Sequence, residues 1–263
     1  MPETDLSLLI DAARQSGDIA MRFFQKNPNV TDKPDGAGPV TEADLAVNNM
    51  LEETLGDARP DYGWLSEETE DSDARMSTER QFVVDPIDGT RAFIEGGKDW
   101  SHALAIVKDS QVVAAAVYLP VRNVMFAATL GGGATMNGVP IRASEVQIEG
   151  ATVLGAKPNF DGRFWRGGVA PPIKRAFRSS LAYRLCLVGQ GRFDGMMTLR
   201  PSWEWDIAAG ALIATEAGAR VTDQHDRPLQ FNNIFPKVPG VLAAGPDLHA
   251  NLAVLLEPQN ANP

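Results

Sequence analysis

Two aspartates that follow a short apolar run are placed to bind a cation beside a phosphate. Asp85 and Asp88 lie three residues apart in Val83-Val84-Asp85-Pro86-Ile87-Asp88-Gly89-Thr90, and the proline stiffens the turn between them. Carboxylates at a strand end suit hard cations, which take oxygen ligands, and amides at the start of a helix suit a phosphate. Asp-Pro or Asp-Gly alone is typical of a plain turn. The whole octapeptide favours a metal and a phosphate held side by side.

Two further acidic segments offer candidate ligands, and each has an ordinary structural alternative. Glu67 ends an apolar approach in Leu65-Ser66-Glu67-Glu68, although more acids follow and a solvated charge run would look the same. Asp206 stands at the start of an apolar helix in Trp203-Glu204-Trp205-Asp206-Ile207, where an aspartate is also a common N-cap. Carboxylates, carbonyls and waters are the ligands that magnesium requires, so these segments favour magnesium.

The three histidines add nothing to such a site. His102, His225 and His249 all lie outside the acidic segments. A zinc site or a serine triad therefore lacks its parts. We expect water to attack the phosphorus directly and in line, without a covalent intermediate.

Together the three segments resemble the inositol monophosphatase superfamily, the magnesium-dependent, lithium-sensitive phosphatases that include 3'(2'),5'-bisphosphate nucleotidases. That family shows a Glu-Glu pair, then Asp-Pro-Ile/Leu-Asp-Gly-Thr, then Trp-Asp before a helix of small residues, and all three occur here in order. The resemblance extends from about Leu6 to Leu256. It implies an α/β fold, the layered αβαβα sandwich of the inositol monophosphatase and fructose-1,6-bisphosphatase type.

The resemblance also implies how the chain is divided. Residues 1–150 would form an N-terminal α+β half that carries most of the metal ligands. Residues 151–263 would form a C-terminal α/β half that supplies Asp206 and residues of the substrate pocket. The active site would lie between the halves of one compact unit, and a homodimer is expected as in relatives.

Residue by residue, the resemblance implies a site with two to three Mg²⁺ ions, one of which Li⁺ would replace as an inhibitor. The implied metal ligands are Glu67, Asp85, the carbonyl of Ile87, Asp88 and Asp206. The implied catalytic residues are Asp44, Thr90 and Glu67, with Thr90 and Asp44 positioning the attacking water. The implied substrate-binding residues are the amides of Gly89 and Thr90, together with Lys33 on a mobile metal loop, Ser179, Ser180, Arg200 and Asp206.

For the substrate, several short runs look like the bacterial bisphosphate nucleotidase branch, among them Arg91-Ala92-Phe93-Ile94 and Val117-Tyr118-Leu119-Pro120-Val121. Inositol phosphatases place an acid that contacts sugar hydroxyls shortly before Trp-Asp, whereas residues 196–202 contain no acid here. Arg200 could instead meet a second phosphate, with Ser179 or Ser180 in the same pocket; a surface arginine and turn serines are the alternative.

This pattern predicts a 3'(2'),5'-bisphosphate nucleotidase that converts 3'-phosphoadenosine 5'-phosphate to AMP and phosphate. Inositol-1-monophosphatase is the first alternative, followed by histidinol-phosphate or fructose-1,6-bisphosphate phosphatase. A catalytically silent sensor of a phosphorylated metabolite is the alternative that is not an enzyme.

Hydropathy patterns predict the elements that must position these residues. Apolar residues at three- and four-residue steps predict a helix over 5–25, and Thr41 with Asp44 resembles a capping box that opens a second helix. A short buried strand over 81–84 should stop at Asp85-Pro86. An antiparallel meander over 103–107, 112–118 and 124–129 should follow it. Helices over 181–188, 207–217 and 248–256 and strands over 153–155 and 238–244 are expected in the second half.

The composition excludes several classes of protein. The 263 residues are 44% hydrophobic and 22% charged, as in ordinary globular domains. The net charge of -10 disfavours a nucleic acid polymer or an anionic membrane as partner. Cys186 is the single cysteine, the first residues are acidic where a signal peptide is basic, and no apolar stretch is long enough to span a bilayer. We therefore expect a cytoplasmic protein that binds a small phosphorylated metabolite.

Overall fold

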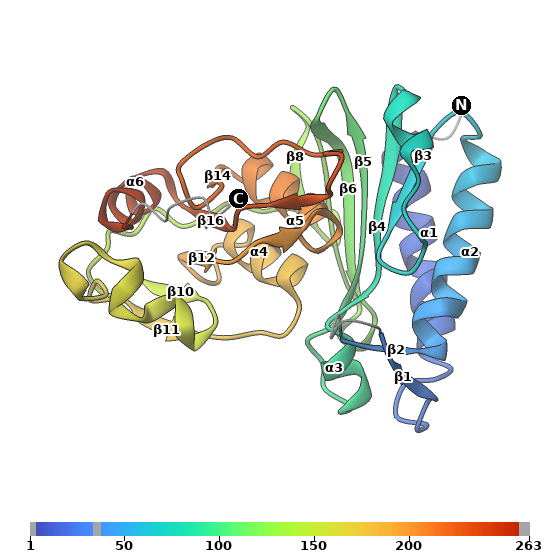
Figure 1. The fold of residues 1–263 in the computed structure, drawn as a ribbon, viewed down its shortest axis with the longest axis horizontal. Helices are drawn as coiled ribbons and strands as arrows, with labels where there is room; N and C mark the ends of the chain where they lie inside the picture. The colour runs from blue at the N-terminus through green and yellow to red at the C-terminus, as the bar shows by residue number, and fades with distance from the viewer. Residues whose placement is uncertain (1–3, 34–37, 258–263) are drawn as a thin grey trace.

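The molecule is built of five layers, which a computed structural model describes for residues 4–33 and 38–257. Helices α1 and α2 cover one face of a seven-stranded sheet, and α4 and α5 cover its other face (Figure 1). A five-stranded sheet packs on the far side of α4 and α5, and α6 closes the stack. This αβαβα order confirms the predicted fold class.

The helices are α1 Asp5–Ala20, α2 Glu42–Ala58, α3 Thr90–Ile94, α4 Leu181–Gly189, α5 Glu204–Glu216 and α6 Pro246–Leu255. The 3₁₀ turns are η2 Asp73–Ser77, η3 Pro120–Arg122, η4 Lys157–Phe160, η5 Gly162–Phe164 and η6 Arg166–Gly168. The strands of the large sheet are β3 Gly63–Ser66, β4 Arg80–Asp88, β5 Ser101–Lys108, β6 Gln111–Leu119, β7 Val124–Thr129, β8 Gly133–Met136 and β9 Val139–Pro140. The other strands are β1 Val30–Asp32, β2 Pro39–Thr41, β10 Thr152–Leu154, β11 Lys174–Ala176, β12 Gly195–Thr198, β13 Ser202–Trp203, β14 Arg220–Thr222, β15 Lys237–Val238 and β16 Val241–Ala244.

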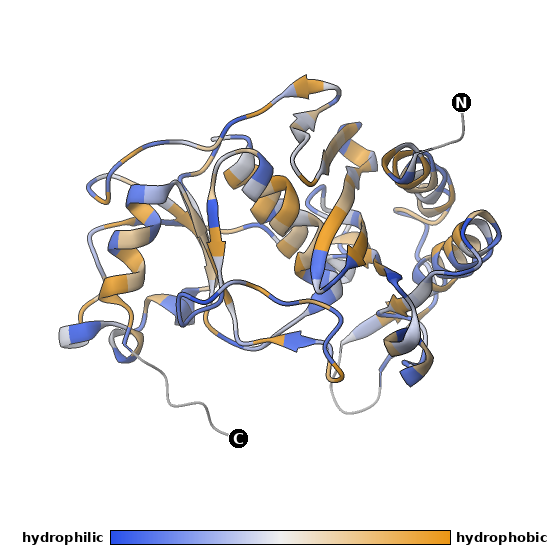
Figure 2. Cartoon of the chain, turned by 90° about the horizontal axis from the view of Figure 1, so that it is seen from above, coloured by the Kyte–Doolittle hydropathy of each residue, from blue (hydrophilic) through white to orange (hydrophobic). Residues whose placement is uncertain are grey.

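The large sheet runs in chain order from β3 to β9. Strand β3 is parallel to β4, and each later pair is antiparallel, so the predicted meander over β5, β6 and β7 is confirmed. The five-stranded sheet has the order β11-β10-β12-β16-β14 and mixes parallel and antiparallel pairs. Figure 2 shows the apolar helices α4 and α5 enclosed between the two sheets.

Strand β4 decides where Asp85, the first of the predicted metal ligands, points. Phe82 and Val84 pack on the side of α1 and α2, whereas Val83 packs on the side of α4 and α5. Because successive side chains of a strand point to opposite faces, Asp85 continues the row of Val83 toward α4 and α5. The sheet thus aims this carboxylate at the second half of the chain.

The prediction that this strand stops at Asp85-Pro86 was wrong. Asp85 still pairs with Ala103 and Asp88 pairs with Ser101, with a register shift between them. Pro86 lies in that irregularity, where its missing N–H costs no ladder hydrogen bond. Both aspartates are therefore held inside a continuous strand of the sheet.

Two helix boundaries differ from expectation. Helix α1 ends at Ala20, about one turn before the predicted end, because the next residues form turns. Helix α5 starts at Glu204, so Trp203 is its N-cap and Asp206 lies inside the first turn. The N-cap alternative for Asp206 is therefore wrong. The predicted capping box of α2 is confirmed, because the Thr41 and Asp44 side chains each accept a hydrogen bond from the backbone N–H of the other.

Candidate active site

Three carboxylates from different parts of the chain converge at one point. Glu67 follows β3, Asp85 lies in β4 and Asp206 lies in the first turn of α5. One carboxylate oxygen of each lies within 4.8 Å of one from the other two. Opposed carboxylates at this spacing repel one another unless protons or a cation lie between them. The three residues could therefore hold a metal ion.

The state of Asp85 agrees with a cation at this position. Its Oδ1 is buried and has no hydrogen-bond partner among the described residues. Burial raises the pKa of Asp85 well above its usual range, and the nearby charges of Glu67 and Asp88 raise it further. Burial, with the charges of Asp88 and Glu67, also raises the pKa of Asp206 well above its usual range. A hard cation would satisfy the unpartnered oxygen and remove the repulsion, so these donors fit magnesium.

Asp88 lies outside that group of three and is held by α4. Its Oδ1 accepts from the amide of Leu181 at 3.2 Å, and its Oδ2 accepts from the amide of Ala182 at 2.7 Å. The Ser180 hydroxyl also donates to Oδ2 at 2.5 Å. Burial raises the pKa of Asp88 to about 6 despite these hydrogen bonds. Its role as a metal ligand stays a prediction.

Ser180, which is predicted to contact substrate, is not among the described residues that line a cavity over the carboxylates. Ser180 is fully buried and caps α4 by accepting from the amide of Tyr183. Its hydroxyl also lies 3.0 Å from that of Ser101. Ser180 therefore fixes the carboxylate of Asp88, while the neighbouring Ser179 lines the cavity.

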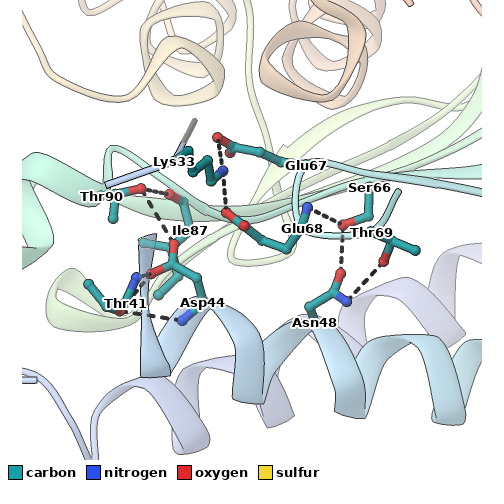
Figure 3. Close-up of polar contacts among 10 residues, drawn as sticks. All are labelled: Lys33, Thr41, Asp44, Asn48, Ser66, Glu67, Glu68, Thr69, Ile87 and Thr90. Atoms are coloured by element: carbon teal, nitrogen blue, oxygen red, sulfur yellow. Dashed lines mark hydrogen bonds and ion pairs between the residues drawn. The ribbon is translucent and has the colours of Figure 1, made fainter. Parts of the chain in front are cut away.

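Asp44 and Thr90 form a hydrogen-bonded pair (Figure 3). Thr90 Oγ1 lies 3.1 Å from the Ile87 carbonyl oxygen and 3.4 Å from Asp44 Oδ1, and it donates to these acceptors. Asp44 Oδ2 accepts from the amide and hydroxyl of Thr41. Burial raises the pKa of Asp44 to about 6. This carboxylate can therefore accept a proton that reaches it through Thr90.

Lys33 pairs with two glutamates (Figure 3). Its Nζ lies 2.8 Å from Glu67 Oε1 and 2.7 Å from Glu68 Oε1. Burial raises the pKa of Glu68 to about 7 even with this ammonium beside it. Residues 34–37 of the expected metal loop lie outside the described residues.

A polar network on α2 supports the segment that carries Glu67 (Figure 3). The Ser66 hydroxyl donates to Asn48 Oδ1 at 2.6 Å and accepts from the amide of Glu68. Asn48 Nδ2 in turn donates to Thr69 Oγ1 at 3.0 Å. These contacts hold the turn after β3 against the helix.

Gly89 allows β4 to turn sharply into α3. Its φ of 98° lies in the left-handed region, and a Cβ there would meet Asp99 O at 3.2 Å and Trp100 Cα at 3.3 Å. Glycine is therefore required where the chain passes the carboxylates. Gly89 and Thr90 both line the cavity in front of them, as the predicted phosphate site needs.

A cavity of about 790 Å³ lies over the carboxylates. Its acidic residues are Glu67, Asp85, Asp88, Glu95 and Asp206, and its basic residues are Arg91, Arg163, Arg184 and Arg200. Phe164 and Phe177 add apolar surface. The cavity thus combines acids suited to metal with arginines suited to an anionic ligand.

A second network ties the two acidic segments together. The buried Arg75 guanidinium makes paired hydrogen bonds to Asp71 and donates to the Asn232 side chain and the Asn233 carbonyl. The backbone amides of Asn232 and Asn233 donate to Glu204, two residues before Asp206. Arg75 therefore helps to set the distance between Glu67 and Asp206.

We expect Arg75→Met to weaken magnesium binding more than catalysis. The half-saturating magnesium concentration should rise roughly tenfold, as is usual when a group that supports metal ligands is lost. The kcat at saturating magnesium should stay within about threefold. For Arg75→Lys, which keeps the charge but loses the planar fork, the half-saturating magnesium concentration should lie between those of the unaltered protein and Arg75→Met. If the half-saturating magnesium concentration is unchanged in Arg75→Met, Arg75 does not support the metal ligands.

The raised carboxyl pKa values predict how stability changes with pH. Groups whose pKa is raised on folding stabilise the protein below their unfolded pKa, and this stability is lost as the pH rises through their folded values. For Asp44, Asp88 and Glu68 those values are about 6, 6 and 7. In chelator these carboxyls should therefore lower the Tm as the pH rises from about 4.5, near their unfolded values, to about 7.

Magnesium should raise the Tm more at the upper pH, because it replaces protons at the same carboxylates. Burial lowers the pKa of His102 and His249 to about 4, so these two groups act in the opposite direction below about pH 6.5 and are outnumbered by the five buried carboxyls whose pKa is raised. Thermal scans with EDTA and with magnesium at both pH values measure the effect. A Tm in EDTA that rises with pH would contradict it.

Sequence reasoning missed three residues of the site. Arg75 and Glu204 act through contacts between distant segments, so no local pattern marks them. Arg184 carried a signal, because it is the one charged residue in the otherwise apolar run 181–189. Such a residue is rarely buried without a partner.

Comparison with known proteins gives one family. A model of the inositol monophosphatase family matches residues 1–260. The inositol-1-monophosphatase of Rhizobium meliloti strain 1021 is 31% identical over 242 residues, which cover 87% of this chain and 90% of that protein. Nus factor SuhB of Escherichia coli strain K12 is 29% identical over 229 residues, covering 83% and 84%.

Solved structures show the same fold. The IMPase of Thermotoga maritima superposes with a TM-score of 0.79 and 30% identity, covering 93% of each chain. The extragenic suppressor protein suhB of Bartonella henselae also gives 0.79, with 28% identity over 94% of this chain and 96% of that one. Among the residues that the structure describes, no helix is both long and apolar enough to span a membrane.

Proposed function

The chain belongs to the inositol monophosphatase family of phosphatases, and we propose that it hydrolyses a small phosphorylated metabolite with magnesium and water. The observation that carries this proposal is the convergence of Glu67, Asp85 and Asp206 beside the pair Asp44 and Thr90. A decayed sensor would not need both arrangements. The silent alternative is therefore disfavoured.

In this proposal Glu67, Asp85 and Asp206 hold metal, with Asp88 and the Ile87 carbonyl as further ligands of two to three ions. When bound, magnesium neutralises the phosphate and lowers the pKa of a water. The amides of Gly89 and Thr90 bind the phosphate oxygens.

The chain's own groups then handle the proton. The attacking water donates a hydrogen bond to Thr90 Oγ1, whose own hydrogen is donated to Asp44. As the water oxygen bonds to phosphorus, the ester P–O bond breaks, a proton passes through Thr90 to Asp44, and the leaving oxygen takes a proton from solvent water. Glu67 would hold the metal that lowers the pKa of the attacking water.

We propose a bisphosphate nucleotide, 3'-phosphoadenosine 5'-phosphate, as the first substrate. Thr198, Leu199 and Arg200 line the cavity in the segment where inositol phosphatases place an acid. The Arg200 guanidinium suits a second phosphate, whereas this segment lacks the carboxylate that would accept hydrogen bonds from sugar hydroxyls. Phe164 and Phe177 offer apolar surface for a base.

Inositol 1-phosphate is the second candidate, and it rests on the relatives. The Rhizobium meliloti protein is named for that substrate and is 31% identical. The name Nus factor belongs to the SuhB relatives, and the charge of -10 gives no reason to extend a nucleic acid partner to this chain. Histidinol phosphate and fructose 1,6-bisphosphate follow.

A panel of these four phosphate esters tests the proposal. Phosphate release should require magnesium and stop in EDTA. The kcat/KM should be highest for 3'-phosphoadenosine 5'-phosphate. A higher value for inositol 1-phosphate would move the chain to the second candidate, and no magnesium-dependent release from any ester would refute the enzyme proposal.

Lithium inhibition is a further expectation from the family resemblance. Lithium should replace one weakly held magnesium ion, so phosphate release should fall in the tens of millimolar range, an order-of-magnitude threshold set by ligand charge and rigidity. Sodium at the same concentration is the control. Equal effects of the two salts would count against the usual metal site.

We also propose a homodimer, which the family resemblance implies. Light scattering on the purified protein should give about twice the chain mass of 28.3 kDa. A monomer mass at micromolar concentration would reject it.

A further inference from the structure

Helix α4 carries one charged side chain, and that side chain is buried. Arg184 is 6% exposed, and its neighbours along the helix are apolar or neutral. It nevertheless lines the cavity over the carboxylates. A guanidinium in this position is costly to desolvate unless something in the cavity compensates it.

The protein itself satisfies only part of this guanidinium. Its Nε donates to the Arg178 carbonyl at 2.6 Å, and one terminal nitrogen donates to the Ser179 carbonyl at 3.3 Å. The group lies over the Phe177 ring, 4.4 Å from its centroid. Among the described residues, no carboxylate forms an ion pair with it within 4.0 Å. Carbonyls and a ring orient the cation but leave its charge uncompensated.

Two acids without a direct contact attract the Arg184 cation electrostatically, Asp88 and Asp206. The proposed function uses both of them as metal ligands. Burial lowers the pKa of Arg184 to about 10, so the group is still a cation at neutral pH. Arg200 lies close enough to repel it and lines the same cavity. Two guanidiniums that line one cavity and repel each other favour an anion between them.

We propose that Arg184, together with Arg200, binds a second phosphate of the substrate, separate from the one that is hydrolysed. This inference rests on the proposed function and deepens it. Helix α4 holds Asp88 by the amides of Leu181 and Ala182, and it presents Arg184 about one turn later. One rigid helix therefore sets the spacing between the metal side and the second anion. A substrate with two phosphates can place one at the metal site and the other at Arg184 and Arg200.

Paired substrates and matched variants test this subsite. 3'-Phosphoadenosine 5'-phosphate carries the second phosphate, and adenosine 3'-phosphate lacks it. For Arg184→Met, the KM for the bisphosphate should rise roughly 10- to 100-fold, the effect of losing hydrogen bonds to a charged group. The kcat should change little, and kcat/KM for adenosine 3'-phosphate should stay within about twofold.

Two controls separate this role from a structural one. Arg175→Met removes an exposed cation of β11 outside the cavity and should leave kcat and KM for both substrates unchanged. Arg184→Lys keeps the charge without the planar fork and should lose part of the preference for the bisphosphate over adenosine 3'-phosphate. If the methionine variant does not fold, this lysine variant tests the subsite.

If Arg184→Met loses kcat/KM equally on both substrates, or loses it on neither, the second-phosphate subsite is refuted and the proposed phosphatase activity is not. Failure of the unaltered protein to release phosphate from either substrate with magnesium would instead refute the proposed function, and with it this inference.

Discussion

Asp85→Asn should lower kcat by roughly a thousandfold or more, comparable to the loss of a principal electrostatic group of an active site. The side chain continues the row of Val83 out of β4, and it meets Glu67 and Asp206 at the point where metal is expected. An amide keeps the shape and removes the charge. Phosphate release at saturating magnesium measures the loss.

The same substitution should stabilise the protein in chelator. It removes one buried carboxyl group, whose pKa is raised by burial and by the neighbouring carboxylates. The Tm in EDTA should therefore rise, and magnesium should no longer raise it. Asp73→Asn changes an exposed acid of the η2 turn, which precedes β4, and this variant should behave as the unaltered protein. Near-native turnover by Asp85→Asn would show that Asp85 is not a metal ligand.

Asp44→Asn should lower kcat by about 100-fold or more, the usual contribution of a general base. Asp44 receives the hydrogen bond of Thr90, and burial raises its pKa to about 6, which suits a proton acceptor near neutral pH. Asparagine can still accept from Thr41 but cannot take the proton. The half-saturating magnesium concentration should change by less than about threefold. Steady-state kinetics at varied magnesium separates the two quantities.

The capping box of α2 requires a control for this variant. Asp44 also accepts from the Thr41 amide, so Asp44→Asn should lower the Tm by a few degrees. Glu42→Gln changes an exposed acid of the same first turn and should leave kcat unaltered. If Asp44→Asn retains kcat within about threefold, Asp44 is not the proton acceptor.

The layers and the acid cluster could be predicted because three acidic segments resemble those of the inositol monophosphatase family, and single elements could be predicted because their signals are local. Glu67, Asp85 and Asp206 each follow or open an apolar element, and the alternation of Phe82, Val83 and Val84 sets the direction of Asp85. The end of β4 could not be read in this way. Its continuation past Pro86 depends on pairing with β5, which is a contact between separate segments.

The supporting contacts were out of reach for the same reason. Arg75 meets Asn232 across 157 positions of the chain, and Ser180 meets Asp88 across 92. Ser180 looked like a turn or pocket residue because its partner is supplied only by the packing of α4 on the large sheet. Arg184 differs, since a lone charge in an apolar helix is visible in the sequence.

The acidic composition also has a different meaning once the acids are placed. The net charge of -10 disfavours an anionic ligand on average. Three of the acids that line the cavity converge at one point, however, and four arginines line the same cavity. Metal bound at that point would make the cavity attractive to a phosphate ester.

The central claim is that carboxylates from both halves of the chain form one metal centre. Crystals grown with Mn²⁺ in place of magnesium, measured at the manganese absorption edge, test it directly. We predict anomalous peaks within about 2.0–2.4 Å of carboxylate oxygens of Glu67, Asp85 and Asp206. Manganese bound elsewhere, with none at these three residues under conditions that support phosphate release, would contradict the claim.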